Sequence, residues 1–320
     1  MIDAKQTLKF LTPSPTDFVE VAVLERDGMV ESRHRGIAAL VGSDGKLIDQ
    51  LGSAKRVIYP RSAVKPIQAV AMLRAGLEVA GSELAICCAS HQGTADHLAL
   101  VEAVLASAGL SESDLQCPAA WPGNSQARSA ALEETKLAFN CSGKHAGFLA
   151  ASVAAGWDTG SYLDPSHPMQ VLTREVLEEY AGERILHSTI DGCGAPLHML
   201  TVEGLARAIG KLSAEQDQIV NAMLDNPAMV GDKNTVDAIL MGEGLVSKLG
   251  AEGVLVVGLR DGHGVAVKIA DGSIRSAPLV AVALLRKHSL ISDEVAERLN
   301  LRLAVESKAG NSSLGGLRAL

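Results

Sequence analysis

A serine and a lysine three positions apart, at the start of an apolar segment, are the residues best suited to carry out chemistry. Ser62 and Lys65 precede an apolar-periodic run that ends at Gly76. Pro66 is tolerated only in the first turn of a helix, where backbone donors lack partners, so a helix is predicted to begin near Ser62. Residues three apart share a helix face, and the Lys65 amine is therefore expected to reach the Ser62 hydroxyl.

Such a pair supports acyl transfer. A serine hydroxyl becomes a good nucleophile when a neighbouring base takes its proton. Lysine can be that base only if burial or a nearby cation makes it neutral at working pH. From the spacing alone, however, a helix N-cap serine followed by a solvated lysine is the favoured interpretation, and both stay open here.

Two further polar residues stand beside apolar segments. The run from Leu84 to Ala89 predicts a buried strand, and it opens into Ser90-His91-Gln92-Gly93. The end of a buried strand is a favoured place for chemistry, although Ser90 also fits an N-cap. Lys268 interrupts a second apolar strand, so its charge must face either a cleft or solvent.

Cysteines lie in two glycine-rich loops, around Cys141 and around Cys193. Two thiols and a nearby amine or imidazole can hold one metal ion, and His145 is the third ligand that ordinary metal chemistry favours. The spacing is not that of a zinc finger, so two unrelated buried thiols are the simpler interpretation.

Composition excludes several classes of protein. The chain has 320 residues, of which 47% are hydrophobic, enough for a substantial core. A formal net charge of −8 and only 3% aromatic residues argue against a nucleic-acid partner. The first residues lack a signal-peptide pattern and no run reaches spanning length, so we expect a cytoplasmic protein without a membrane partner. Five cysteines, an odd number, are expected to be free thiols.

The hydrophobic pattern predicts one catalytic unit, 1–320, of mixed α/β (α+β) class. An antiparallel sheet from both termini, approximately 1–60 and 253–320, would hold a mainly helical insert, 61–252, with the cleft between them. Specific expectations are strands over 18–24, 36–41, 46–48, 253–259 and 265–269, an exposed polar edge over 31–35, helices through most of 200–250 and over 278–287, and a weakly helical C-terminus.

Several short sequence motifs, including those around the serines, lysines and cysteines named above, follow one another in a fixed order. The resemblance described below covers roughly Val19 to Leu285. The motifs are Pro60-Arg61-Ser62-x-x-Lys65-Pro66, Ala89-Ser90-His91-Gln92-Gly93, Asn140-Cys141-Ser142-Gly143-Lys144-His145-Ala146-Gly147, Asp191-Gly192-Cys193-Gly194-Ala195-Pro196 and Gly250-Ala251-Glu252-Gly253. Together they resemble the asparaginase II family of the Rhizobium etli inducible type. The resemblance implies a fold like the serine β-lactamases, penicillin-binding proteins and glutaminases. It also implies a homodimer and the hydrolysis of L-asparagine to L-aspartate and ammonia.

The same resemblance implies a set of site residues. Two Ser–Lys pairs are expected, Ser62 with Lys65 and Ser90 with Lys268. Ser62 would attack the side-chain amide with Lys65 as its base, while the second pair would relay protons to the leaving ammonia. Which serine attacks stays open.

The resemblance also changes the expected metal site. It implies a zinc ion on Cys141, Lys144 and Cys193, with Lys144 in place of His145. The zinc would organise the cleft without generating the nucleophile. Arg61 and His91 are candidates for binding the substrate carboxylate, because a charged substrate needs matching charges.

Two alternatives to an asparaginase are carried forward. One is another Ser–Lys amidohydrolase or esterase on the same fold, and the other is a non-catalytic protein that binds an amino acid or a metal. Two departures from the family pattern, at Cys117-Pro118 and at Asn226-Pro227, leave substrate affinity and the discrimination against glutamine open.

Overall fold

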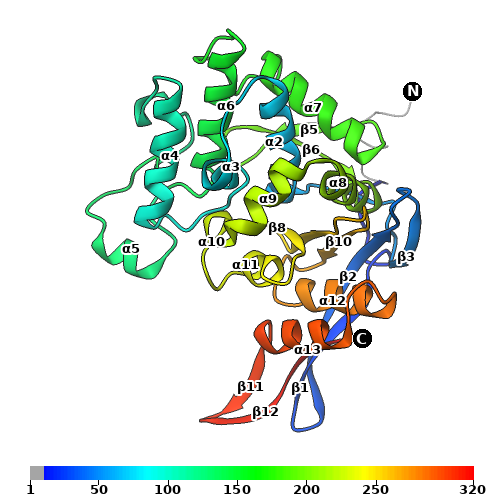
Figure 1. The fold of residues 1–320 in the computed structure, drawn as a ribbon. Coiled ribbons are helices and arrows are strands. Elements are labelled where there is room, and N and C mark those ends of the chain that lie inside the picture. The colour runs from blue at the N-terminus through cyan, green and yellow to red at the C-terminus, as the bar shows by residue number, and fades with distance from the viewer. Residues whose placement is uncertain (1–10) are drawn as a thin grey trace.

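The central element is an antiparallel sheet built from both ends of the chain (Figure 1). The computed structural model describes residues 11–320. The strand order is β11-β12-β1-β2-β10-β9-β8, and β3 pairs beside β2. Its first strand, β1, pairs with its last, β12. The bounds are β1 Val19–Arg26, β2 Met29–Val41, β3 Leu47–Leu51, β8 Val246–Gly250, β9 Val254–Gly258, β10 Gly264–Ile269, β11 Glu306–Ala309 and β12 Ser312–Ala319.

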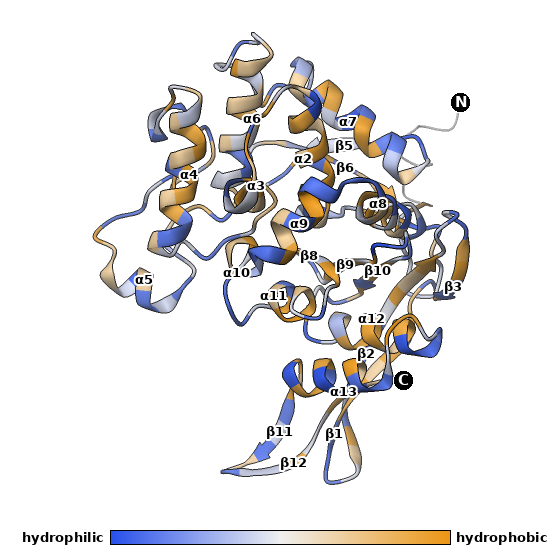
Figure 2. Ribbon diagram, viewed as in Figure 1, coloured by the Kyte–Doolittle hydropathy of each residue, from blue (hydrophilic) through white to orange (hydrophobic). Residues whose placement is uncertain are grey.

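Both faces of the central part of this sheet are buried. Along β2, Ile37 and Ala39 belong to one hydrophobic core, whereas Ala38 and Leu40 belong to another. Successive side chains of a strand point to opposite faces, so an unbroken apolar run indicates cover on both sides. Helix α8 (Val202–Glu215) packs on one face, and α12 (Ala277–Lys287), itself packed against α13 (Asp293–Arg302), covers the other. Figure 2 shows the hydrophobic colouring of α12.

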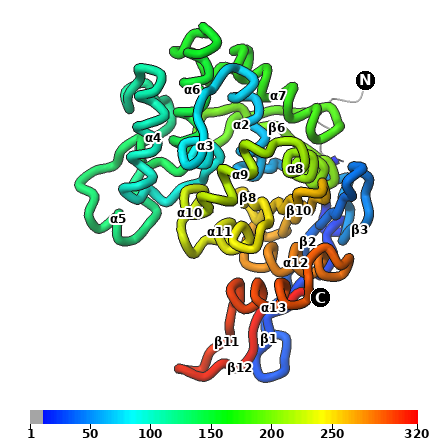
Figure 3. The backbone as a smooth tube through the Cα atoms, in the orientation of Figure 1, coloured from blue at the N-terminus to red at the C-terminus, as the bar shows by residue number. Residues whose placement is uncertain are grey.

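A mainly helical portion lies between β3 and β8, and Figure 3 traces the chain into it and back to the sheet. Two short sheets, β4 with β7 and β5 with β6, accompany the helices. The expected fold class is confirmed: a mixed α/β protein whose antiparallel sheet comes from both termini. The bounds are β4 Val57–Ile58, η1 Arg61–Val64, α2 Lys65–Arg74, α3 Gly81–Cys87, α4 Ala95–Ser107, η2 Glu112–Asp114, α5 Ser125–Ala130, α6 Ser142–Ala154, α7 Pro168–Ala181, β5 Ser188–Ile190, β6 Pro196–His198, β7 Leu200–Thr201, α9 Asp217–Asp225, α10 Pro227–Val230 and α11 Val236–Met241.

Three local predictions were wrong. Residues 84–89 were expected to form a strand, but most of them belong to the helix α3. A short run that is buried all round has no period by which helix and strand can be told apart. Residues 246–250 form β8 where helix was expected, and the C-terminus ends in β11 and β12 after α13. The polar segment 31–35 is mostly exposed, as predicted, within β2.

Two glycines allow the close approaches that shape the site. A Cβ on Gly143 would lie 2.2 Å from the Ile86 carbonyl oxygen, so only glycine lets the start of α6 rest on α3. A Cβ on Gly250 would lie 2.4 Å from the Pro60 carbonyl oxygen. This second contact seats the end of β8 against the turn that carries Ser62. Among the described helices, none is long and apolar enough to span a membrane.

Candidate active site

Ser62 lies in the 3₁₀ turn η1, directly before α2. Its predecessor Arg61 has φ of 53°, in the left-handed region that side chains disfavour, and such strain clusters at functional sites. The N-cap of η1 is Pro60 and that of α2 is Val64, so the N-cap explanation of Ser62 is wrong. Instead, Ser62 lines a small cavity of about 10 Å³ together with Lys65.

The Lys65 amine is enclosed and points toward a second serine. The side chain is 2% exposed. Its Nζ donates to the Ala89 carbonyl and, at 3.0 Å, to the Ser90 hydroxyl. Within the described residues, it makes no hydrogen bond to Ser62. The structure therefore brings together Lys65 and Ser90, while Ser62 lines the same small cavity as this lysine.

Burial is the main influence on the charge of Lys65. It lowers the pKa of the amine, because the charged form loses its hydration. The Cys141 thiol opposes this shift, whereas the neighbouring lysines Lys248 and Lys144 lower the same pKa further. The net effect favours the neutral amine, which is the form a general base requires.

Lys248 is a residue of this site that the sequence analysis missed. It is 0% exposed in β8, and its Nζ lies 3.2 Å from the Asp237 carboxylate. Asp237 also accepts a hydrogen bond from Ser247, at 2.8 Å. In the sequence, Lys248 stands out only as a charged residue within an apolar stretch. That stretch was predicted to be helical, and Lys248 was not singled out. The pair places a buried cation near Lys65.

Cys141, Lys144 and Cys193 meet, as the resemblance implied. Lys144 Nζ lies 3.0 Å from Cys193 Sγ. A hydrogen bond from Cys193 lowers the pKa of the Cys141 thiol well below its ordinary range. Burial acts to lower the pKa of Lys144, but the two sulfurs outweigh it and raise that pKa.

This donor set fits a zinc ion. Two thiolates and an amine nitrogen are ligands that zinc accepts, provided that Lys144 gives up its proton on binding. Within residues 11–320, no group of three or more His, Cys, Asp and Glu side chains could hold a metal, so the lysine would be needed as third ligand. His145 instead uses Nδ1 to contact the Tyr162 hydroxyl at 2.8 Å.

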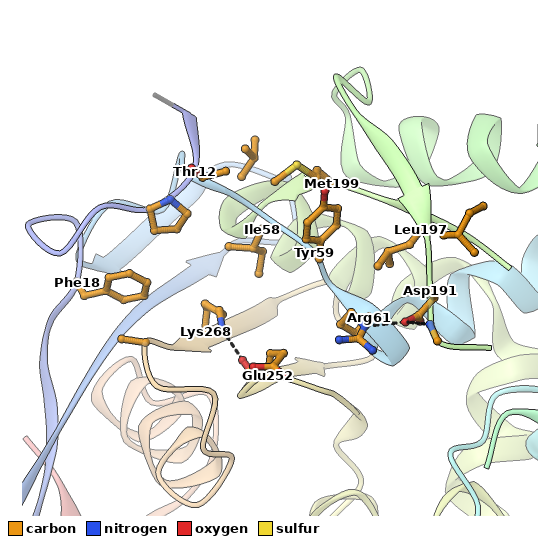
Figure 4. A pocket seen from close by; sticks show the side chains of 15 residues that line it. Thr12, Phe18, Ile58, Tyr59, Arg61, Asp191, Leu197, Met199, Glu252 and Lys268 are labelled. Carbon is orange, nitrogen blue, oxygen red and sulfur yellow. Dashed lines mark hydrogen bonds and ion pairs between the residues drawn. The ribbon is translucent and has the colours of Figure 1, made fainter. Parts of the chain in front are cut away.

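A larger cavity of about 540 Å³ adjoins the first and contains Lys268 (Figure 4). Lys268 lies two residues after Ala266 in β10, and period-2 alternation places both on the face toward the helical portion. Its Nζ donates to the backbone carbonyls of Glu252 and Ile269. Burial lowers the pKa of this amine too. Among the described residues, Lys268 has no hydrogen bond to Ser90, so the expected second pair is not in contact.

An ion pair stands where the two cavities adjoin. Arg61 Nε donates to Asp191 at 2.8 Å, and both residues line both cavities. Figure 4 shows the two side chains pointing toward one another. Arg61 thus lines both cavities, and its binding of a substrate carboxylate stays a prediction. Asp191 and Glu252 were not singled out, although both belong to motifs quoted in the sequence analysis.

His91 lies behind the cavity walls. It is 1% exposed, and its Nε2 contacts the Ser142 hydroxyl at 2.8 Å. The Gly93 backbone N–H donates to its Nδ1 at 3.1 Å. In the part of the chain that the structure describes, His91 lines neither cavity. In this arrangement it supports the start of α6 and does not face a substrate.

One protein family and several solved structures are similar to this chain. The sequence model of L-asparaginase II matches residues 22–319. No curated protein matches the sequence significantly. Among solved structures, a β-lactamase from Mycobacterium bovis is 16% identical with a TM-score of 0.43, covering 89% of this chain and 99% of that one. Mglu in its native form is 15% identical with a TM-score of 0.43, over 80% of this chain and 64% of Mglu, so the chain spans less than two thirds of that protein. Because the family match extends over nearly the whole sequence, the chain belongs to the L-asparaginase II family, which supports an amidohydrolase activity.

Proposed function

We propose that this amidohydrolase is an L-asparaginase that releases ammonia from L-asparagine through an acyl-enzyme on Ser62. The observation that carries the proposal is the enclosed Lys65, which lines a cavity together with Ser62 and whose amine lies 3.0 Å from the Ser90 hydroxyl. A lysine whose ammonium form is disfavoured by burial can act as a general base at neutral pH.

Ser62 is the proposed nucleophile because it lines the cavity. Within the described chain, Ser90 lines neither of the two cavities. In the first step, Lys65 takes the Ser62 proton while Oγ bonds to the amide carbon of the substrate. The amide C–N bond then breaks, and the nitrogen leaves as ammonia with a proton supplied by Lys65. Ser90, hydrogen-bonded to the lysine, holds the amine in place and offers a relay for that proton.

The larger cavity is the proposed binding site for the charged end of the substrate. Arg61 and Lys268 offer positive charge to the α-carboxylate, and Asp191 offers negative charge to the α-ammonium. Charge-assisted hydrogen bonds of this kind fix orientation as well as affinity. Lys268 keeps its place in the site, but in this account it acts through the substrate rather than through direct contact with Ser90.

Cys141, Lys144 and Cys193 would hold the proposed zinc ion, which supplies positive charge that organises the cleft when bound. These residues lie next to Lys65, and Lys144 lines the smaller cavity. Loss of the metal should therefore lower activity without abolishing it. A homodimer belongs to the same proposal, with the family resemblance as its support, and so does a cytoplasmic location.

The test is ammonia release from L-asparagine by the wild type and by Ser62→Ala, each with and without added zinc. The matched control is Ser43→Ala, since Ser43 and Lys46 have the same spacing, but the Lys46 amine pairs with Asp44 on the surface. We expect an active wild type, an active Ser43→Ala and no activity above background for Ser62→Ala. Full activity of Ser62→Ala would contradict the proposal. An inactive wild type, even with zinc, would favour the alternative ester and β-lactam substrates.

A further inference from the structure

One buried histidine beside Ser62 has no role in the steps above. His198 is the last residue of β6, where it pairs with Ser188 of β5. Its side chain is 6% exposed. The Nδ1 atom contacts the Ser188 hydroxyl at 2.7 Å. The other ring nitrogen, Nε2, is inaccessible to solvent and has no hydrogen-bond partner among the described residues.

The unpaired nitrogen belongs to a side chain that lines the same cavity as Ser62. Lys65, Gln68 and Lys144 also line this cavity, whose volume is about 10 Å³. That is close to the smallest volume that holds one water molecule, and water is retained in such a space when several polar groups surround it. A buried polar atom without a partner is also destabilising, which favours a bound water here.

We propose that His198 Nε2 holds a water molecule beside Ser62 and that this water hydrolyses the acyl-enzyme. The inference rests on the proposed function, because it needs an acyl group on Ser62. The water oxygen bonds to the acyl carbon, and the ester bond to Ser62 Oγ breaks. One proton of the water passes through Lys65 to Ser62 Oγ, so the products are the free acid and the regenerated serine. His198 acts through the water and is a positioning residue.

Ser188 has a supporting part in this arrangement. Its hydroxyl contacts Nδ1, which fixes the plane of the imidazole ring and therefore the direction in which Nε2 points. Because the strand pairing places Ser188 opposite His198, the contact comes from the backbone register of β5 and β6. Ser188 itself is exposed, so its hydroxyl can be removed with little risk to the core.

The experiment follows the fate of the acyl-enzyme in the full-length protein supplied with L-asparagine and hydroxylamine. The acyl group passes either to water, giving aspartate, or to hydroxylamine, giving the hydroxamate. In His198→Leu we expect aspartate formation to fall about 100-fold, the loss that misplacement of a reacting group can cause. The hydroxamate-to-aspartate ratio should rise, and acylated protein should accumulate in acid-quenched samples. His198→Gln, which keeps a polar group near Nε2, should recover part of the water reaction.

Other results would overturn the inference. One is an unchanged product ratio in His198→Leu, and another is an equal loss of both products without acyl-enzyme, which would place His198 in binding or acylation. If His198→Leu fails to fold, Ser188→Ala and His198→Gln are measured instead. We then expect a smaller rise of the hydroxamate-to-aspartate ratio, and an unchanged ratio in both variants would contradict the inference. A wild type that releases no ammonia would instead overturn the proposed function itself.

Discussion

Lys65 and Lys268 line two adjoining cavities and both have a pKa lowered by burial, but their surroundings differ. Lys65 is 2% exposed and lines a cavity of about 10 Å³, next to a serine hydroxyl. Lys268 is half-buried in a cavity of about 540 Å³, and its amine contacts backbone carbonyls. The enclosed lysine suits proton transfer, whereas the more open one suits binding of an anionic group. In the proposed function, the different positions of the two lysines therefore give them two different roles, which the sequence pattern does not distinguish.

The largest effect should follow from removing the enclosed amine. Lys65→Met keeps a chain of similar length without the base, and we expect kcat to fall by about 10³-fold or more. Steady-state ammonia release checks this, with Lys46→Met as the surface control. A Lys65→Met protein that folds and retains most of its kcat would contradict the role of Lys65 in proton transfer, and with it the proposed difference between the two lysines.

The next effect concerns the buried ion pair near Lys65 and its contribution to the stability of the protein. Lys248→Met would leave the Asp237 carboxylate buried without its cation, which should cost about 3–5 kcal/mol of unfolding free energy. Urea denaturation measures this loss. The double variant Lys248→Met/Asp237→Leu should recover a large part of it, because no charge is left unpaired. If the single variant is as stable as the wild type, the buried pair does not stabilise the fold.

For Lys268, in the larger cavity, we expect a smaller effect, which falls on KM more than on kcat. Lys268→Met should raise KM for L-asparagine about tenfold, equivalent to about 1.4 kcal/mol of binding, while kcat changes less. Lys268→Arg, which keeps the charge, is the matched control and should stay closer to the wild type. A kcat loss as large as that of Lys65→Met would instead place Lys268 in proton transfer.

The smallest effect is a pH dependence of the unfolding free energy that comes from His97 in the helical portion. Burial lowers the pKa of His97, whose Nε2 contacts the Ala228 carbonyl at 2.9 Å. The unfolded chain binds this proton more readily, with a histidine pKa of about 6.5, so stability should fall as the pH drops below about 6.5. The slope for one such group is at most about 1.4 kcal/mol per pH unit. Unfolding free energies between pH 7 and 5 should fall less steeply in His97→Gln, and an unchanged slope would contradict the assignment.

What the sequence could predict followed from local signals. The helix after Ser62 was recognisable from Pro66 and the apolar period, and the strands β1, β2, β9 and β10 from their turns. The two cysteine-containing loops could be recognised in the sequence. The prediction that Cys141, Lys144 and Cys193 form one site came only from the family resemblance. Spacing could not reveal that Lys65 contacts Ser90, because that contact depends on how α2 packs beside the end of α3. Nor could it reveal Lys248, since a charge in an apolar stretch gives no sign of its partner.

Mapping the acylated serine tests the central claim most directly. The wild type is mixed with L-asparagine, quenched in acid within the first turnovers, digested and analysed by mass spectrometry, with His198→Leu as a variant expected to accumulate the intermediate. We predict an aspartyl group on the peptide that contains Ser62 and none on the peptide that contains Ser90. An aspartyl group on Ser90 would make that serine the nucleophile and Lys65 its direct base, and would contradict the assignment of Ser62.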